Sequence, residues 1–497
     1  MKKSNDYLRV KSIAIEAGKP IVALHEKDAE DKSIHVGDRV IVSKKGDGKD
    51  VEIGIIDITD TMVARGEVGI FEGFPLKLRQ GQLVRVDPGP KPASVAYIRK
   101  KVDGLELQSN EMEAIMKDVV EDRLSEIELS AFVTASYIYG YSEKETVSLT
   151  WAMVNSGEKI DLKGLVVDKH CIGGVPGNRT TMIMVPIMAS LGVMMPKTSS
   201  RAITSPAGTA DTMEVLAPVT FSAEEVKRLT EEVGGCIVWG GGLSLAPADD
   251  KIIQVEYPLS IDAEGQVLAS IISKKKSVGS DYVLVDLPVG PGAKIEDRKD
   301  AISLGKKFVK LGDEVGMKVK YILTDGSNPI GKGIGPALEA RDVLKTLAGE
   351  GSPELAEKGM MMAGTLLEFC GKAKAGEGKT MARKALESGA ALDKMHEIIK
   401  AQGGKPIKPG RIKVGRFKTD FFADKKGIVK DIDNKIVALA ARTAGAPKDP
   451  RAGIYLEKGV GRVVEPGEKL FTIYSQNKVK LGYAEDAVNT TNPYKIM

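Results

Sequence analysis

A glycine-rich turn between two apolar stretches constrains this chain more than any other feature. Gly164-Leu165-Val166-Val167 precedes it and residues 182–189 follow, so the sequence predicts a strand, a turn over residues 168–181 and a helix. Glycines allow positive φ and a close approach of the backbone, and the N-terminus of a helix attracts anions. Lys169 and Arg179 add positive charge to the turn. Its pattern is neither a Walker loop nor a dinucleotide fingerprint, but it favours a phosphate ligand.

Charge and cysteine content exclude several classes of protein. The 497 residues include 72 Lys+Arg and 68 Asp+Glu, a net charge of +4 that is too balanced to suggest a nucleic-acid or membrane partner. Three cysteines without a Cys-x-x-Cys pair argue against a disulfide framework and structural zinc, and no acidic or histidine cluster has the spacing of metal ligands. Without a signal-type or 18-residue apolar run, we expect a soluble cytoplasmic protein that holds no metal.

The hydrophobic period changes along the chain and divides it into four parts. Short alternating strands come first and a proline-rich linker follows them. The capping-box spacing of helix starts then occurs three times, at Asn110…Glu113, Ser125…Glu128 and Ser142…Glu145. Apolar strands then alternate with helical stretches, which predicts a parallel sheet. We expect an α/β core with a mainly parallel sheet plus a helical domain, preceded by a small β domain and followed by an α+β domain with one alanine-rich helix. The predicted parts are residues 1–88 (β), 93–163 (helical, joined by a later helical segment), 164–401 (α/β) and 412–497 (α+β).

A second motif lies downstream of the glycine turn. Residues 199–214 are rich in hydroxyl groups around Arg201 and open a helix after Gly208-Thr209. Lys-His-x-x-Gly-Gly-Val, Ser-x-Arg with Gly-Thr-x-Asp-x-x-Glu, and Ser-Leu-Ala-Pro-Ala-Asp at residues 244–249 follow one another in order. Together these motifs resemble the thymidine/pyrimidine nucleoside phosphorylase family, and the resemblance extends over about residues 93–490.

Departures from the family pattern indicate one branch of it. Cys171 stands where the family has a phosphate-binding serine, Val255 where it has an arginine that reads the pyrimidine, and Lys294 where it has an aromatic residue. With the extra β domain, these features resemble the archaeal AMP phosphorylases. The resemblance implies phosphorolysis of AMP, and of CMP and UMP, to ribose 1,5-bisphosphate and free base in nucleotide degradation. Phosphate is then a co-substrate and no cofactor is needed. The alternatives are a phosphorylase of unphosphorylated nucleosides, a phosphoribosyltransferase of related fold, and a binding or scaffold protein.

The resemblance also implies the residues of the site. Asp262 would donate a proton to the leaving base, with Glu264 as the fallback, and His170 would lie near the base. The phosphate-binding residues implied are Lys169, Gly173, Gly174, Thr181, Ser199 and Thr209. The AMP-binding residues implied are Gly174, Ser200, Arg201, Ala202, Ile203, Thr204, Ser205, Thr209, Ser270, Lys274 and Lys294. A thiol is a weak donor, so Cys171 is not included. The family resemblance further implies a homodimer through the helical domain, or a larger homo-oligomer.

Overall fold

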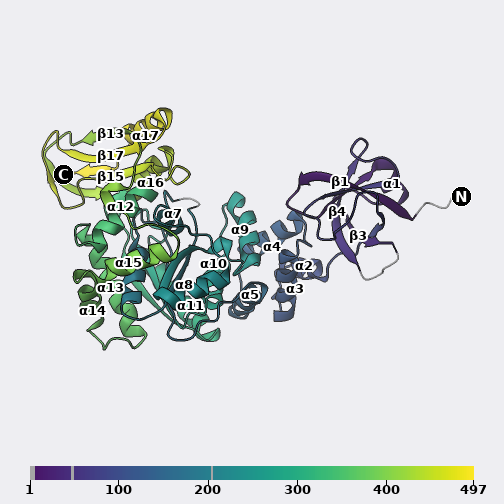
Figure 1. Cartoon of the computed structure of the whole chain (residues 1–497), viewed down its shortest axis with the longest axis horizontal. Helices are drawn as coiled ribbons and strands as arrows, with labels where there is room; N and C mark the ends of the chain where they lie inside the picture. Colours follow the sequence, from purple (N-terminus) through teal and green to yellow (C-terminus); the bar gives the residue numbers. More distant parts are fainter. Residues whose placement is uncertain (1–5, 46–49, 203–204) are drawn as a thin grey trace. The chain divides into compact units, whose positions relative to one another are not determined.

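The fold is described from a computed structural model, which covers residues 6–45, 50–202 and 205–497. The chain divides into two compact units (Figure 1). The first unit comprises Met1–Ala152 and Pro247–Gln266, and the second comprises Met153–Ala246 and Val267–Met497. The first is built from a β barrel and helices, whereas the second has parallel strands, surrounding helices and two small antiparallel sheets.

A closed six-stranded barrel forms the N-terminal part of the first unit (Figure 1, purple). Its strands follow the order β1-β5-β2-β4-β3-β6, with β6 pairing antiparallel to β1. Their bounds are β1 (Tyr7–Glu16), β2 (Ile21–His25), β3 (Arg39–Lys44), β4 (Val51–Thr59), β5 (Glu67–Glu72) and β6 (Leu83–Pro88), with a short helix α1 (Glu26–Asp31) after β2. Alternate apolar side chains such as Val22, Val40 and Val84 are fully buried, as the period of two along a strand requires.

Helices make up the rest of the first unit. They are α2 (Ala93–Val102), α3 (Ser109–Val120), α4 (Glu126–Tyr139), α5 (Glu143–Ser156), whose last turn belongs to the second unit, and α9 (Pro247–Leu259). Helix α9, distant in sequence, packs against α3 and α4. Two of the three predicted capping boxes are confirmed: the amide of Glu128 donates to Ser125 Oγ at 3.3 Å, and that of Glu145 donates to Ser142 Oγ at 3.1 Å. The third, at Asn110 and Glu113, was wrong, because α3 begins earlier and the amide of its N-cap residue Gln108 donates to Glu111 at 2.7 Å.

Parallel strands organise the second unit. Three form a sheet in the order β11-β10-β7, namely β7 (Val167–Cys171), β10 (Tyr282–Val289) and β11 (Lys318–Asp325). Strands β8 (Met195–Ser199) and β9 (Gly235–Trp239) pair in parallel beside them, and a parallel bridge from Val166 to Met194 connects the two groups. Because all these strands run the same way, the loops that follow them emerge at one edge, where α/β folds place their ligands.

Helices surround these strands, and α6 (Thr180–Ser190) lies in the largest apolar core. Residues Thr180 to Ala189 are all buried, so α6 is apolar on every side, as an internal helix must be. Helices α13 and α15 pack against it. The remaining helices of this part are α7 (Thr209–Glu214), α8 (Ala223–Val233), α10 (Glu264–Ser277), α11 (Arg298–Glu314), α12 (Pro336–Leu347), α13 (Pro353–Phe369), α14 (Gly378–Glu387) and α15 (Ala390–Ala401). No helix in the described residues is long and apolar enough to cross a membrane.

The C-terminal part of the second unit combines two small antiparallel sheets with two helices (Figure 1, yellow). One sheet has the order β12-β15-β17-β13, from β12 (Gly333–Ile334), β15 (Gly453–Leu456), β17 (Lys469–Ser475) and β13 (Phe417–Phe422). The other has the order β16-β14-β18, from β16 (Val463–Val464), β14 (Gly427–Ile432) and β18 (Tyr494–Ile496). Helices α16 (Asn434–Thr443) and α17 (Lys478–Thr491) pack together beside them.

Expectations about local structure also differed from the structure at β7 and in the C-terminal part. The predicted strand ends at Val167, but β7 begins there and continues through Asp168, Lys169 and His170 to Cys171. Charged residues are accommodated in this buried strand because oppositely charged side chains surround them, which the hydrophobic pattern does not reveal. The alanine-rich helix expected in the C-terminal part around Lys435–Thr443 is confirmed as α16, but the second helix there, α17, was not expected. Apolar residues lie on more than one side of α17, since Val479 and Tyr483 are exposed whereas Leu481, Ala484 and Val488 are buried, so no single apolar stripe marks this helix in the sequence.

Candidate functional site

The candidate site begins at the carboxyl end of β7, where Lys169 is fully buried. The Nζ atom of Lys169 donates a hydrogen bond of 3.1 Å to Thr180 Oγ1, in the first turn of α6. It also lies 3.8 Å from Asp286 Oδ2, on the neighbouring strand β10. The lysine therefore lies between the start of α6 and the end of the sheet. A helix N-terminus and an ammonium group together favour an anion.

The loop between β7 and α6 needs glycine at two successive positions. Gly173 has φ +99° and Gly174 has φ +93°, both in the left-handed region. A Cβ atom on Gly174 would lie 2.2 Å from the backbone nitrogen of Lys294, so only glycine permits this approach. The contact brings the loop after β10, which carries the exposed side chain of Lys294, against the glycine loop. Three predicted residues, Gly173, Gly174 and Lys294, are thus close together.

Two aspartates beneath this loop each pair with two lysines. Asp168 Oδ1 accepts a hydrogen bond of 3.1 Å from Lys197 Nζ, and its Oδ2 lies 2.7 Å from Lys275 Nζ. Lys197 also donates to the backbone oxygen of Lys169 at 2.8 Å. These contacts attach β8 and α10 to the strand that carries Lys169.

The second aspartate is Asp286, on β10. Its Oδ2 lies 3.3 Å from Lys358 Nζ on α13 and 3.8 Å from Lys169 Nζ. Its Oδ1 accepts a hydrogen bond of 2.6 Å from Thr324 Oγ1. The six charged side chains of the two groups are all buried. Four of them are lysines and two are aspartates, so ammonium groups outnumber carboxylates in this network.

The network shifts the acid strengths of its members. Burial alone would raise the pKa of Asp168, but Lys197 and Lys275 outweigh it and hold the pKa below its usual value. Burial lowers the pKa of Lys197 to about 7, with Asp168 opposing this effect. Burial also lowers the pKa of His170 well below its usual value, and nearby lysine charges add to this effect. His170 is therefore neutral at physiological pH and can exchange hydrogen bonds but not supply a positive charge.

Arg179 has a different role from the one expected of it. Its guanidinium pairs with the buried carboxylate of Glu339 on α12 and also donates to the backbone oxygens of Asn178 and Ala207. Glu339 accepts a further hydrogen bond of 2.8 Å from Thr212 Oγ1. Because Glu339 neutralises its charge, Arg179 adds no positive charge for a ligand. It joins the glycine loop to the hydroxyl-rich loop that ends at Thr209.

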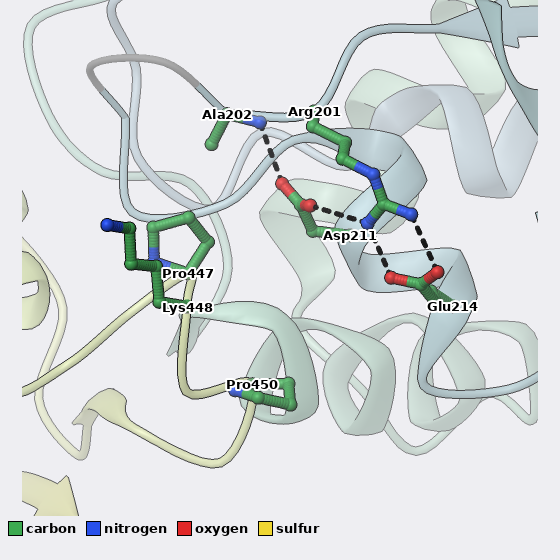
Figure 2. A pocket seen from close by; sticks show the side chains of 7 residues that line it. All are labelled: Arg201, Ala202, Asp211, Glu214, Pro447, Lys448 and Pro450. Atoms are coloured by element: carbon green, nitrogen blue, oxygen red, sulfur yellow. Dashed lines mark hydrogen bonds and ion pairs between the residues drawn. The ribbon is translucent and has the colours of Figure 1, made fainter. Parts of the chain in front are cut away.

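The hydroxyl-rich loop after β8 is folded around Asp211. One carboxylate oxygen of Asp211 accepts a hydrogen bond of 2.7 Å from the amide of Ala202 (Figure 2). The same oxygen accepts one of 2.8 Å from the amide of Gly208. A Cβ on Gly208 would lie 2.6 Å from the Ser200 oxygen, so the two ends of the loop are in contact. Ser199, Ser200, Ala202, Ser205 and Thr209 thus lie on one compact loop, whereas Ile203 and Thr204 fall outside the described residues.

Arg201 is committed to acidic partners. Its two terminal nitrogens lie 2.5 and 2.7 Å from the carboxylate of Glu214, and one of them lies 3.4 Å from Asp211 (Figure 2). The guanidinium also stacks 5.0 Å from the ring of Trp239. A pocket of about 310 Å³ adjoins Arg201, Ala202, Asp211 and Glu214, and its opposite wall is formed by Pro447, Lys448 and Pro450. A ligand phosphate at Arg201 must therefore compete with Glu214.

The remaining predicted residues lie on α10, in the segment before it and at the start of α6. Ser270 and Lys274 are half-buried on this helix, and Lys275 beside them pairs with Asp168. Thr181 is buried in the first turn of α6. Asp262 and Glu264 are exposed and belong to the first unit, Asp262 in the segment between α9 and α10.

The chain is 44% identical to the AMP phosphorylase of Methanococcoides burtonii over 98% of its own length and 96% of the relative's. It is 46% identical to that of Thermococcus kodakarensis over 98% and 97%, and 46% identical to that of Methanothrix thermoacetophila over 94% and 91%. The chain belongs to the AMP phosphorylase family.

Family models and solved structures place the AMP phosphorylase fold in a wider group. Residues 95–157 match the helical bundle domain and residues 163–392 the a/b domain of a glycosyl transferase family, and residues 428–495 match the pyrimidine nucleoside phosphorylase C-terminal domain. Anthranilate phosphoribosyltransferases share the fold: that of Thermus thermophilus has a TM-score of 0.51 at 18% identity, covering 62% of this chain and 99% of its own. That of Saccharomyces cerevisiae has a TM-score of 0.51 at 15% identity, covering 63% and 99%.

Sequence motifs did not identify several charged residues of this site. They are Asp168, Lys197, Lys275, Asp286 and Lys358. A signal was present for two of them. Asp286 interrupts the apolar run Val283–Leu287, and Lys358 lies at helical spacing from the buried residues Leu355 and Met362. A charged residue in a buried position needs partners, and such residues mark candidate sites.

Proposed function

We propose that this chain catalyses the phosphorolysis of AMP by inorganic phosphate, giving ribose 1,5-bisphosphate and adenine. The observation that carries the proposal is its identity of 44–46% to AMP phosphorylases over nearly the whole chain. The reaction is a pentosyl transfer, in keeping with the glycosyl transferase a/b domain that residues 163–392 match. CMP and UMP are proposed as further substrates.

The glycine loop would bind the attacking phosphate. Lys169 and the start of α6 supply positive charge, and Thr181, Ser199 and Thr209 supply hydroxyl donors near it. Donors held rigidly in a buried site position the attacking oxygen without reorganisation during the reaction. The contribution of Cys171 is small, since burial raises the pKa of this thiol and its Sγ instead accepts a hydrogen bond of 3.4 Å from Asn178.

The nucleotide would occupy the loops after β8 and β10 and helix α10. Arg201 and Lys294 are proposed for the 5′-phosphate, with Ser200, Ala202 and Ser205 around the nucleotide and Ser270 and Lys274 at the base. Asp262 would protonate the leaving base, and His170, which is neutral, would orient it by a hydrogen bond. General acid catalysis of this kind contributes roughly 10²–10⁴-fold to a rate.

Phosphate is a co-substrate in this proposal, and neither a metal nor a cofactor takes part. The cytoplasmic location and the homodimer or larger homo-oligomer expected from the sequence belong to the proposal as well.

A substrate comparison tests the function. The pure protein is incubated with phosphate and, separately, AMP, adenosine or thymidine, and the released base is measured by chromatography. We expect release from AMP with formation of ribose 1,5-bisphosphate, and no release when phosphate is omitted. Release from adenosine or thymidine but not from AMP would contradict the proposal and favour a nucleoside phosphorylase.

The proton-transfer role of Asp262 has its own variant. Asp262→Asn keeps the size of the side chain but removes the acidic proton, so base release from AMP should fall while phosphate affinity is unchanged. Glu264→Gln, at the fallback position two residues away and also exposed, is the comparison variant: a loss there but not in Asp262→Asn would assign the proton transfer to Glu264. Equal losses in both variants would argue against a specific role for Asp262.

A further inference from the structure

Asp286 pairs with two lysines at different distances. Lys358 and Lys169 share its Oδ2 atom, and Lys358 is the closer partner, at 3.3 Å against 3.8 Å. Among the described residues, Lys358 Nζ makes no hydrogen bond, whereas Lys169 Nζ donates one to Thr180 at the start of α6. One carboxylate can neutralise only one of two ammonium groups. Asp286, Lys169 and Lys358 together therefore carry one uncompensated positive charge.

The surplus charge lies at the start of the glycine loop. Asp286 pairs with Cys171 across the parallel strands, and the amide of Ile172 donates to the backbone oxygen of Asp286 at 3.1 Å. Lys358 reaches this position from α13, where it occupies the buried face of the helix. An uncompensated charge in a buried position is costly, and an anion in the adjacent loop would balance it.

We infer that Lys358 is a positioning residue for the phosphate site: by neutralising Asp286, it leaves the charge of Lys169 available to the phosphate. Without Lys358, Asp286 would pair with Lys169 alone, and the ammonium group that faces the start of α6 would be neutralised within the protein. The inference deepens the proposed function and rests on phosphate being its co-substrate. It adds a residue of α13, far from the sequence motifs, to the groups that set phosphate affinity.

The first experiment measures binding of inorganic phosphate alone by isothermal titration calorimetry, at constant ionic strength set with chloride. Lys358→Met keeps the length of the side chain and removes its charge. We expect its phosphate dissociation constant to rise by roughly 10-fold or more, as when a charge-assisted contact is lost. Lys358→Arg keeps the charge and should retain most of the affinity.

A double variant separates this role from direct contact. In Asp286→Asn with Lys358→Met no carboxylate remains to capture Lys169, and the amide oxygen can still accept from Thr324. We therefore expect the double variant to regain most of the phosphate affinity that Lys358→Met loses. Failure to regain it would overturn the inference, because Lys358 would then act on phosphate itself or on the fold.

Thermal unfolding without phosphate provides the structural control. Lys101 is as buried as Lys358, but it pairs one-to-one with Glu145 at 2.7 Å in the first unit. Lys101→Met should lower the melting temperature and leave phosphate affinity unchanged, since it strands a buried carboxylate. Lys358→Met leaves Asp286 paired with Lys169, so its melting temperature should change little. A fall like that of Lys101→Met with normal phosphate affinity would overturn the inference.

The two proposals fail separately. Phosphate binding that depends on Lys358 in a protein that releases no base from AMP would refute the proposed function and support the inference. Base release from AMP with phosphate affinity unchanged in Lys358→Met would support the proposed function and refute the inference.

Discussion

The loops after β7 and β8 follow neighbouring strands but hold their positive charge in opposite ways. Lys169, at the first loop, is 1% exposed and shares a single carboxylate with a second lysine. The side chain of Arg201, in the second loop, is 36% exposed and pairs with both Glu214 and Asp211. The first loop has charge to spare for an anion, whereas the second has its charge already neutralised.

This difference indicates two modes of binding phosphate. A rigid, buried, surplus charge is preorganised and suits the group that must be aligned for reaction. An exposed arginine with acidic partners must exchange one anion for another, and its net gain is smaller because the partner it leaves is also favourable. This difference supports the proposal that the attacking phosphate binds at the first loop and that Arg201, in the second loop, binds the 5′-phosphate of the nucleotide.

The largest effect is expected at the first loop. Lys169→Met removes the surplus charge and the hydrogen bond to Thr180, so kcat/KM for phosphate should fall roughly 10²–10³-fold, as for loss of a preorganised donor. Steady-state kinetics with phosphate varied at saturating AMP would measure it. A loss that appears only in KM for AMP would show that the two loops have been assigned the wrong way round.

Arg201→Met tests the second loop and should have a smaller effect. Removal of one charge-assisted bidentate contact should raise KM for AMP roughly 10- to 100-fold and leave KM for phosphate unchanged. Arg201→Lys keeps the charge but not the planar fork, so its KM for AMP should lie between those of the unmodified protein and Arg201→Met. Equal increases in both KM values would mean that Arg201 maintains the loop rather than binding the nucleotide.

The buried charges also predict a pH dependence of stability. Lys197 has a pKa of about 7 in the folded protein against its usual 10.5, so between these values the unfolded chain binds more protons. The free energy of unfolding should therefore rise as pH increases from 7 to 9, by at most about 1.4 kcal/mol per pH unit. Guanidinium titrations at pH 7, 8 and 9 would measure the slope.

A buried cysteine limits the pH range over which stability should rise, and a Lys197 variant is the control. Burial raises the pKa of Cys236 from its usual 9.0 to about 12. Above pH 9 the unfolded chain therefore loses this thiol proton while the folded protein keeps it, so the slope of the free energy of unfolding should diminish or reverse. Lys197→Met should remove the rise. A flat profile in the unmodified protein would mean that Asp168 keeps Lys197 charged throughout.

Sequence patterns predicted the parts of the fold whose signals are local. The capping boxes at Ser125 and Ser142 involve residues three apart, and the glycine turn before α6 follows from glycine's access to positive φ. The end of β7 was not predictable in this way. Asp168 and Lys169 look like loop residues until their partners from β8, α10 and β10 are known.

In the candidate site, too, local motifs identified some features, whereas others depend on contacts between separate elements. Motifs within short segments identified Lys169, Gly174 and Arg201 as candidates. The pairing of Arg201 with Glu214 and of Lys169 with Asp286 depends on contacts between separate elements, so it was not predictable from spacing. Whether an arginine is free to bind a phosphate is decided by such contacts.

The smallest effect is expected where Arg201 is released from its partner. Glu214→Gln keeps the shape of the side chain but weakens its hold on Arg201, so KM for AMP should fall by up to about fivefold, the range of an exposed ion pair. The matched control is Glu232→Gln on α8, whose exposed carboxylate lies 4.0 Å from Arg228 and which should leave KM unchanged. If KM rises in Glu214→Gln instead, Glu214 orients Arg201 for the nucleotide rather than competing with it. The second loop would then be as preorganised as the first, and the contrast between the two would not hold.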